Sequence, residues 1–169
     1  IAFAIRARVV LLRDLGQALS PFNAFQLIQG LETLPLRFNK HQENAEKLTG
    51  YLTSHKDIIS VTYPSLFKGP DKTLADKYLS SGNGALIGIE LKGGADAGRS
   101  FIDNLKLIYH VANIGDARTL AIHPASTTHS QLSADDQLKA GVTPGYVRLS
   151  VGIEHIDDII ADIDQALSA

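Results

Sequence analysis

The chain has 169 residues, of which 44% are hydrophobic and 20% are charged, and this composition is ordinary for a globular protein. Its formal net charge of −2 indicates no basic surface, so we predict no nucleic-acid partner. The absence of cysteine excludes a disulfide framework and a thiol nucleophile. No apolar run approaches the ~20 residues that cross a bilayer, so we predict no membrane partner. The lack of cysteine is compatible with the cytoplasmic location that we predict.

The N-terminal part of the sequence predicts consecutive helices. Residues 4–15 have the apolar spacing of an amphipathic helix that ends at Gly16. Ser20 followed by Pro21 is typical of an N-cap and a first helical residue, and predicts a helix to about Leu31. Thr33 is a second candidate N-cap, so we expect the next helix over residues 36–55.

Strands and helices alternate in the rest of the chain. The run 85–91 is apolar at almost every position, which predicts a strand that is buried on both faces. Further strands are expected at 58–63, 107–111, 120–123 and 146–151, and helices at 72–78, 95–105, 134–140 and from about 153 to 167. We therefore predict an α+β fold, a small sheet covered by helices on one side, in a single domain over residues 1–169.

Arg148 lies inside the alternating strand sequence YVRLSV. A strand would send its neighbours Val147 and Leu149 to the opposite face of the sheet. An arginine at such a position is costly unless it meets an anion. From these residues alone, a salt bridge to Asp116 or Glu154 is the simpler interpretation, and a ligand carboxylate held by the planar guanidinium is the alternative.

Three motifs resemble those of a known family. They are V-R-L-S-x-G-x-E at 147–154, H-P-A-S-x-T-H at 123–129, and SPFNAFQLIQGLETLPLR followed by HQENA in the first half. Together they resemble the pyridoxal-phosphate (PLP) enzymes of cysteine and methionine metabolism, most closely the O-acetylhomoserine sulfhydrylases, and they cover nearly the whole chain. The expected fold is that of the C-terminal domain of fold-type I PLP enzymes.

The resemblance assigns three substrate-binding residues. In the family the arginine at the position of Arg148 holds the α-carboxylate of the amino-acid substrate. Asn113, in ANIGDARTL, falls in a segment that contributes to the same site, where many relatives have serine. Thr128 falls near the substrate pocket. For Asn113 the structural alternative is an amide that caps a turn before Gly115.

The resemblance also implies a cofactor that these residues do not anchor. No lysine lies in a context like the family's Ser-x-Thr-Lys segment, so we expect PLP to be held by an N-terminal domain absent from this chain. The start at Ile1 agrees with the C-terminal domain of a larger enzyme. We therefore predict no catalytic and no cofactor-binding residue here, in a full-length enzyme that is a homotetramer.

The implied reaction is a transfer in methionine biosynthesis. O-acetylhomoserine would react with sulfide or a thiol to give homocysteine or methionine, and the isolated chain would be inactive. Two alternatives stay open: a cystathionine γ-synthase or γ-lyase of the same family, and a stand-alone module that binds a small carboxylate.

Two further patterns imitate functional sites. His123 and His129 could suggest a metal, but no clear third ligand accompanies them, so we predict no metal site and expect hydrogen bonds that shape the loop. Residues 93–100 have the glycine spacing of a P-loop, yet Arg99 stands where lysine belongs and Asp96 would repel phosphate. We interpret this segment as a glycine turn between a strand and a helix.

Overall fold

A computed structural model describes residues 1–169 of the chain. The chain divides into two compact units, Ile1–Leu36 and Arg37–Ala169. The second unit contains the whole sheet. Our assignment of residues 1–169 to one C-terminal domain of a larger enzyme stays a prediction.

The first unit is helical, as predicted. Helix α1 (Ala2–Arg6), a π-helical segment (Ala7–Leu12) and α2 (Arg13–Leu15) run without interruption to Gly16, whose φ of 68° ends the helix. Ser20 caps α3 (Pro21–Glu32), because its Oγ accepts a hydrogen bond from the Asn23 backbone nitrogen at 3.1 Å. These helices bury no side chain, and none of the chain's helices has the length and hydrophobicity that a membrane crossing requires.

The second unit follows the predicted order of elements closely. Helix α4 (Leu34–Ser54) begins in the first unit and continues into the second. The strands are β1 (Ile58–Thr62), β2 (Leu86–Leu91), β3 (Tyr109–His110), β4 (Leu120–Ile122) and β5 (Tyr146–Ser150). The helices are α5 (Gly69–Tyr78), α6 (Gly94–Asn104), α7 (Ala134–Lys139) and α8 (Ile156–Leu167). The largest difference is β3, which has 2 residues where we expected a strand over 107–111.

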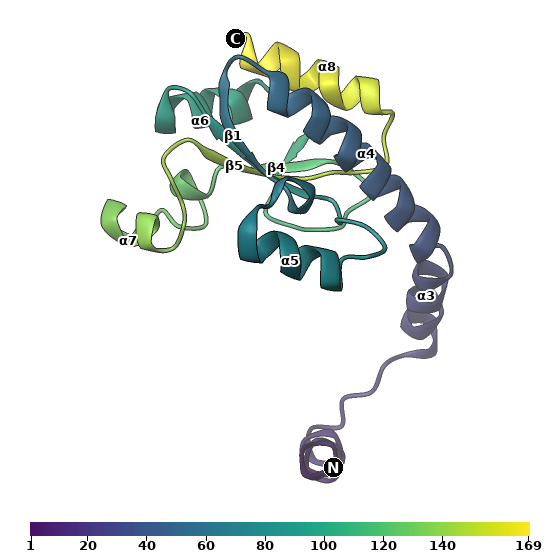
Figure 1. Ribbon diagram of the computed structural model, residues 1–169. Coiled ribbons are helices and arrows are strands. Elements are labelled where there is room, and N and C mark those ends of the chain that lie inside the picture. The colour runs from purple at the N-terminus through teal and green to yellow at the C-terminus, as the bar shows by residue number, and fades with distance from the viewer. The chain divides into compact units, whose positions relative to one another are not determined.

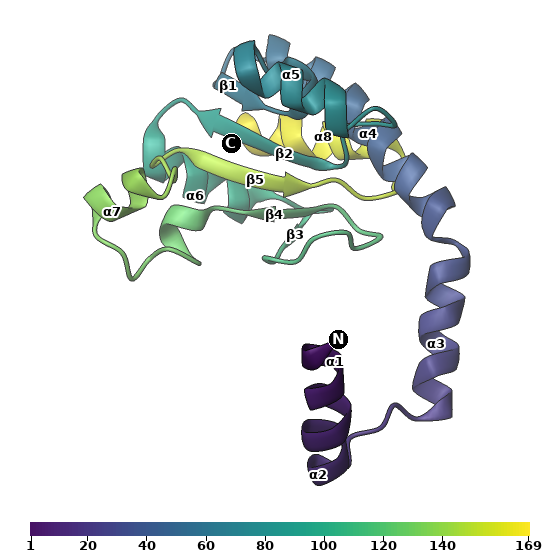
Figure 2. The same ribbon diagram turned by 60° about the horizontal axis from the view of Figure 1, so that its bottom comes forward.

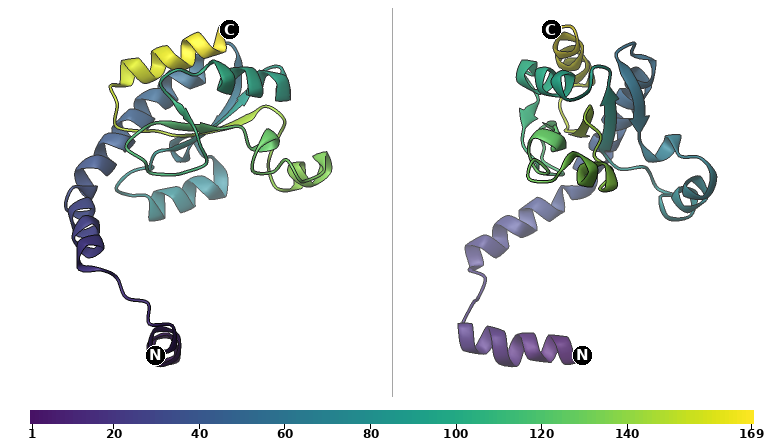
Figure 3. Two further views of the ribbon diagram at one scale, coloured as in Figure 1. Left: turned by 180° about the vertical axis from the view of Figure 1, so that it is seen from behind. Right: turned by 90° about the vertical axis from the view of Figure 1, so that its left-hand side faces the viewer.

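The five strands form one mixed sheet with β5 at its centre. Their order is β1-β2-β5-β4-β3, in which β3 and β4 are parallel and the other neighbours are antiparallel. Helices α4, α6 and α8 gather over one face of this sheet, as Figure 1 and the two views of Figure 3 show. The predicted α+β fold with helices on one side is therefore confirmed.

The hydrophobic core lies between this helix layer and the sheet. Alternate residues of β2 and β5 point into it and meet apolar side chains of the three helices. The main contributors are Ile87, Ile89, Leu91, Val147 and Leu149 from the sheet, and Leu48, Leu52, Phe101, Ile159 and Ile163 from the helices. Figure 2 shows these strands running past α4 and α8.

The opposite face of the sheet is more open, and here one prediction was wrong. We expected β2 to be buried on both faces, but Leu86 is 40% exposed and Glu90 is half-buried. The apolar run misled the prediction because the helix layer covers only one face. We call the other face, which carries Leu86, Gly88 and Glu90 of β2 and Arg148 of β5, the open face.

Candidate carboxylate site

Arg148 projects from the central strand onto the open face. It pairs with Gly88 on one side and with Ile122 on the other. Its neighbours Val147 and Leu149 point the other way and are fully buried in the core. The alternation that the sequence predicted for this strand is confirmed.

The hydrogen bonds of Arg148 leave part of its guanidinium without a partner. Nη2 donates to the backbone oxygens of Ala112, at 2.7 Å, and Asn113, at 3.3 Å. Nε is buried and has no hydrogen-bond partner. A guanidinium presents five N–H donors in a planar fork, so donors remain for an anion beside this loop.

Arg148 does not form the structural salt bridge that was the alternative interpretation. The Asp116 carboxylate accepts a hydrogen bond from the Arg118 nitrogen at 2.9 Å. The Glu154 carboxylate accepts from the nitrogen and the hydroxyl of Thr119, at 2.6 and 2.8 Å. Both acidic groups that could have paired with Arg148 are thus occupied elsewhere, and its charge is not neutralised by an acidic side chain.

A cavity of about 240 Å³ lies beside Arg148 on the open face. Its walls come from the ends of β1 and β2, from the turn that follows β1, and from β5; they include Tyr63, Phe67, Leu86, Gly88 and Tyr146. Burial raises the pKa of Tyr146, and the positive charge of Arg148 opposes part of that rise. A neutral phenol and a guanidinium therefore face the same space, a combination of donors that suits a carboxylate.

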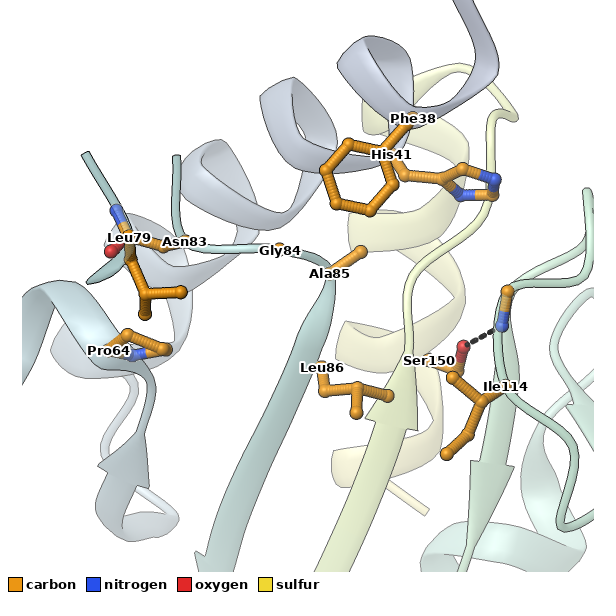
Figure 4. A pocket seen from close by; sticks show the side chains of 11 residues that line it. Phe38, His41, Pro64, Leu79, Asn83, Gly84, Ala85, Leu86, Ile114 and Ser150 are labelled. Atoms are coloured by element: carbon orange, nitrogen blue, oxygen red, sulfur yellow. Dashed lines mark hydrogen bonds between the residues drawn. The ribbon is translucent and has the colours of Figure 1, made fainter. Parts of the chain in front are cut away.

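Asn113 lies in the loop that Arg148 holds. Its backbone oxygen accepts from Arg148, whereas its side chain is exposed and makes no hydrogen bond. The alternative of an Asn113 cap before Gly115 does not apply, because the Gly115 nitrogen donates to Ser150 Oγ at 3.1 Å instead (Figure 4). The Asn113 amide is thus free to donate to a ligand.

A larger apolar hollow of about 410 Å³ adjoins this loop (Figure 4). Phe38 and His41 of α4, Leu86 of β2, and Ile114 and Ser150 line it. Leu86 and Pro64 line both this hollow and the cavity beside Arg148, so the two share a wall.

Thr128 is the predicted site residue that the structure does not bring into contact with the other two. It is exposed, and its Oγ1 lies 2.9 Å from His129 Nδ1. No hydrogen bond joins it to Arg148 or Asn113. Its role at the substrate site stays a prediction.

The two histidines of the same motif are engaged in hydrogen bonds. Buried His123 contacts Ser126 Oγ through Nδ1, at 2.8 Å, and the Pro144 oxygen through Nε2, at 2.7 Å. Because a carbonyl only accepts, Nε2 carries a proton and donates it to the Pro144 oxygen. The His123 ring packs so close to Gly98 that a Cβ there would collide with it.

The segment with P-loop spacing is a glycine turn, as we interpreted it. Gly93 and Gly94 both have positive φ, and α6 begins at Gly94. Gly98, which would end a phosphate loop, lies inside the helix, and Arg99 pairs with Asp96 at 3.0 Å.

Sequence reasoning missed Tyr146 and Ser150. Both lie two residues from Arg148, so the period of a strand places them on the same face. Ser150 is also part of the quoted V-R-L-S motif. The alternation that singled out Arg148 could have identified both.

Comparison with known proteins identifies the family of the chain. Residues 3–168 match the family described as Cys/Met metabolism PLP-dependent enzyme. The chain belongs to this family. It is 55% identical over 168 residues to the O-acetyl-L-homoserine sulfhydrylase of Leptospira meyeri, and 49% identical over 167 residues to the homocysteine synthase of Schizosaccharomyces pombe. Each match covers 99% of this chain, but only 38% and 39% of those relatives.

A solved structure matches the fold as well. It is the crystal structure of a Campylobacter jejuni putative O-acetylhomoserine (thiol)-lyase that contains N'-pyridoxyl-lysine-5'-monophosphate. The TM-score is 0.89 and the identity 46%, over 99% of this chain and 40% of the other. The chain thus has the fold of a part of a PLP enzyme, and the predicted family and its cofactor are confirmed.

Proposed function

We propose that this chain is the C-terminal domain of a PLP-dependent O-acetylhomoserine sulfhydrylase and that it binds the carboxylate of the amino-acid substrate. Arg148 and Asn113 would contact that carboxylate, and Thr128 would line the substrate pocket. The full enzyme would exchange the acetyl group of O-acetylhomoserine for sulfide, or for a thiol, as a cytoplasmic homotetramer of methionine biosynthesis. The names of the relatives support this choice of reaction.

The observation that carries the proposal is the state of Arg148. Its guanidinium sits on the open face without an acidic partner, and its buried Nε makes no hydrogen bond. Leaving a buried donor unsatisfied costs about 1–3 kcal/mol, so its retention argues for a ligand. A substrate carboxylate offers an acceptor of the right charge and shape.

The lysines of this chain lie away from the cavities beside Arg148 and Phe38. No lysine lines the cavity beside Arg148 or the hollow beside Phe38. Several lysines instead pair with surface acids, among them Lys47 with Glu43 and Lys139 with Asp136. When bound, PLP supplies an electron sink for the carbanion chemistry of such enzymes. We assign its attachment to residues outside this chain.

The choice between reactions within the family is tested with the nucleophile. The full-length enzyme, given O-acetyl-L-homoserine with either sulfide or cysteine, should turn over much faster with sulfide. Preference for cysteine would make it a cystathionine γ-synthase. Release of ammonia from cystathionine without an added nucleophile would make it a γ-lyase. A full-length protein with no PLP-dependent turnover would revive the stand-alone carboxylate-binding module.

A separate experiment tests whether PLP is attached to this chain or to the rest of the full-length enzyme. This chain is mixed with PLP, reduced with borohydride and weighed by intact mass spectrometry. We expect no stoichiometric adduct, because no lysine lies at the site. One clean adduct on a single lysine would mean that the chain carries its own cofactor site and would overturn this part of the proposal.

A further inference from the structure

The loop 112–119, which carries Asn113, is fastened to the end of β5 by one polar cluster. The Glu154 carboxylate accepts hydrogen bonds from the nitrogen and the hydroxyl of Thr119, at 2.6 and 2.8 Å. The same hydroxyl oxygen accepts from the Gly152 nitrogen at 2.8 Å. Thr119 is fully buried, so these contacts are shielded from water. We call Thr119 and Glu154 the clasp.

Helix α4 holds the segment 151–154, which follows β5, from the other side. The Asn44 amide donates to the backbone oxygens of Gly152, at 3.0 Å, and Glu154, at 2.8 Å. His41 Nδ1 lies 2.7 Å from the Val151 oxygen and therefore donates to it. Asn44 is fully buried and His41 is 4% exposed. The segment that follows β5 is thus fixed from the helix layer and from the loop.

The clasp leaves the loop little freedom to shift along β5. A Cβ at Gly152 would collide with the Thr119 nitrogen, so the two backbones are in contact there. The Ile153 nitrogen donates to the Ala117 oxygen at 2.9 Å. Together with the bonds of Arg148 to the other end of the loop, these contacts fix where Asn113 stands relative to the guanidinium.

We propose that Thr119, Glu154 and Asn44 are positioning residues for the substrate carboxylate, because they hold the loop of Asn113 at a set distance from Arg148. The inference rests on the proposed function of Arg148 and Asn113. None of the three touches the open cavity beside Arg148, so each acts through the loop. Misplacement of a binding group by about 1 Å can cost on the order of 100-fold in catalysis. Loss of the contacts that hold the loop 112–119 should therefore weaken substrate binding.

The test uses the full-length, PLP-loaded enzyme and the pair Thr119→Val and Thr119→Ser. Valine keeps the shape of threonine and removes both hydroxyl contacts, whereas serine keeps the hydroxyl. We expect Thr119→Val to raise KM for O-acetyl-L-homoserine by about 10-fold, with kcat within about threefold and KM for sulfide unchanged. Thr119→Ser should restore most of the affinity.

Thr49→Val is the matched control, since it removes a hydroxyl that is also buried but has no hydrogen-bond partner. It should leave KM unchanged. Glu154→Gln is the second clasp variant, for use if Thr119→Val folds poorly. It keeps the size of the side chain and one acceptor oxygen, and it should also raise KM for O-acetyl-L-homoserine.

Arg148→Ala, measured in parallel, distinguishes a failure of the positioning role from a failure of the proposed function. If Arg148→Ala raises KM while both clasp variants leave it unchanged, the clasp is not a positioning device and the proposed function stands. A fall in kcat and thermal stability that serine does not restore would also reduce the clasp to a structural role. If Arg148→Ala itself leaves KM unchanged, the proposed function fails, and this inference with it.

Discussion

Replacing Arg148 with alanine in the full-length enzyme is expected to raise KM for O-acetyl-L-homoserine by about 30-fold or more. The loss of a charge-assisted contact to a carboxylate costs on the order of 2–5 kcal/mol, and each 1.4 kcal/mol is tenfold in affinity. KM for sulfide should not change, because the nucleophile carries no carboxylate. Steady-state kinetics with each substrate varied in turn measures both quantities.

Two variants control for this result. Arg148→Lys keeps the charge but loses the planar fork, so its KM should lie between those of the unaltered enzyme and the alanine variant. Arg99→Ala removes an exposed arginine whose partner is Asp96, and should leave KM unchanged. Shortening the Arg148 side chain to alanine leaves the core unchanged, since this side chain lies on the open face. A KM for Arg148→Ala within twofold of the original would remove this residue from the site.

Local sequence patterns predicted the elements and the direction of the key side chain. Ser20 and Gly16 mark helix ends through contacts that span only a few residues, so their sequence signals were sufficient. The alternation around Arg148 placed it on the face opposite Val147 and Leu149 for the same reason. Such signals depend on backbone geometry within one element.

The contacts that shape the site join residues that are far apart in the sequence. Asn44 and Gly152 are 108 positions apart in the chain, and Thr119 and Glu154 are 35 apart. Their pairing depends on the order and register of strands, which local patterns do not determine. The exposure of Leu86 has the same origin, because it depends on where the helix layer ends. The family motifs contained Asn44 and Glu154 without stating what either one holds.

Asp162 is the acidic residue with the most hydrogen bonds to backbone nitrogens in the second unit. Its carboxylate, on α8, accepts from the nitrogens of Lys106, Leu107 and Ile108 at 2.9, 3.0 and 2.9 Å, and from the Gln165 side chain at 3.1 Å. It is 6% exposed. Asp162 thereby fixes the connection between α6 and β3 to the last helix, and holds together elements that no strand pairing joins.

Asp162→Ala is therefore expected to loosen α8 strongly. The buried Ile108 nitrogen loses its partner, while water can reach the more exposed Lys106 and Leu107, so we expect a loss of about 2–4 kcal/mol in local stability. Hydrogen exchange of the amides within α8, whose own helical bonds the substitution keeps, should accelerate by roughly 30-fold to several hundred-fold in the full-length enzyme.

Asp164→Ala is the matched control on the same helix. Asp164 is mostly exposed; it accepts a hydrogen bond from the Tyr51 hydroxyl at 2.7 Å and lies 3.7 Å from His55 Nε2. Its removal should change exchange in α8 by only a few-fold, because a solvent-exposed hydrogen bond contributes on the order of 1 kcal/mol. Equal acceleration in the two variants would mean that the three backbone bonds of Asp162 do not hold the helix. An effect confined to Asp162 would show that this buried carboxylate anchors α8 in addition to the core packing of Ile159 and Ile163.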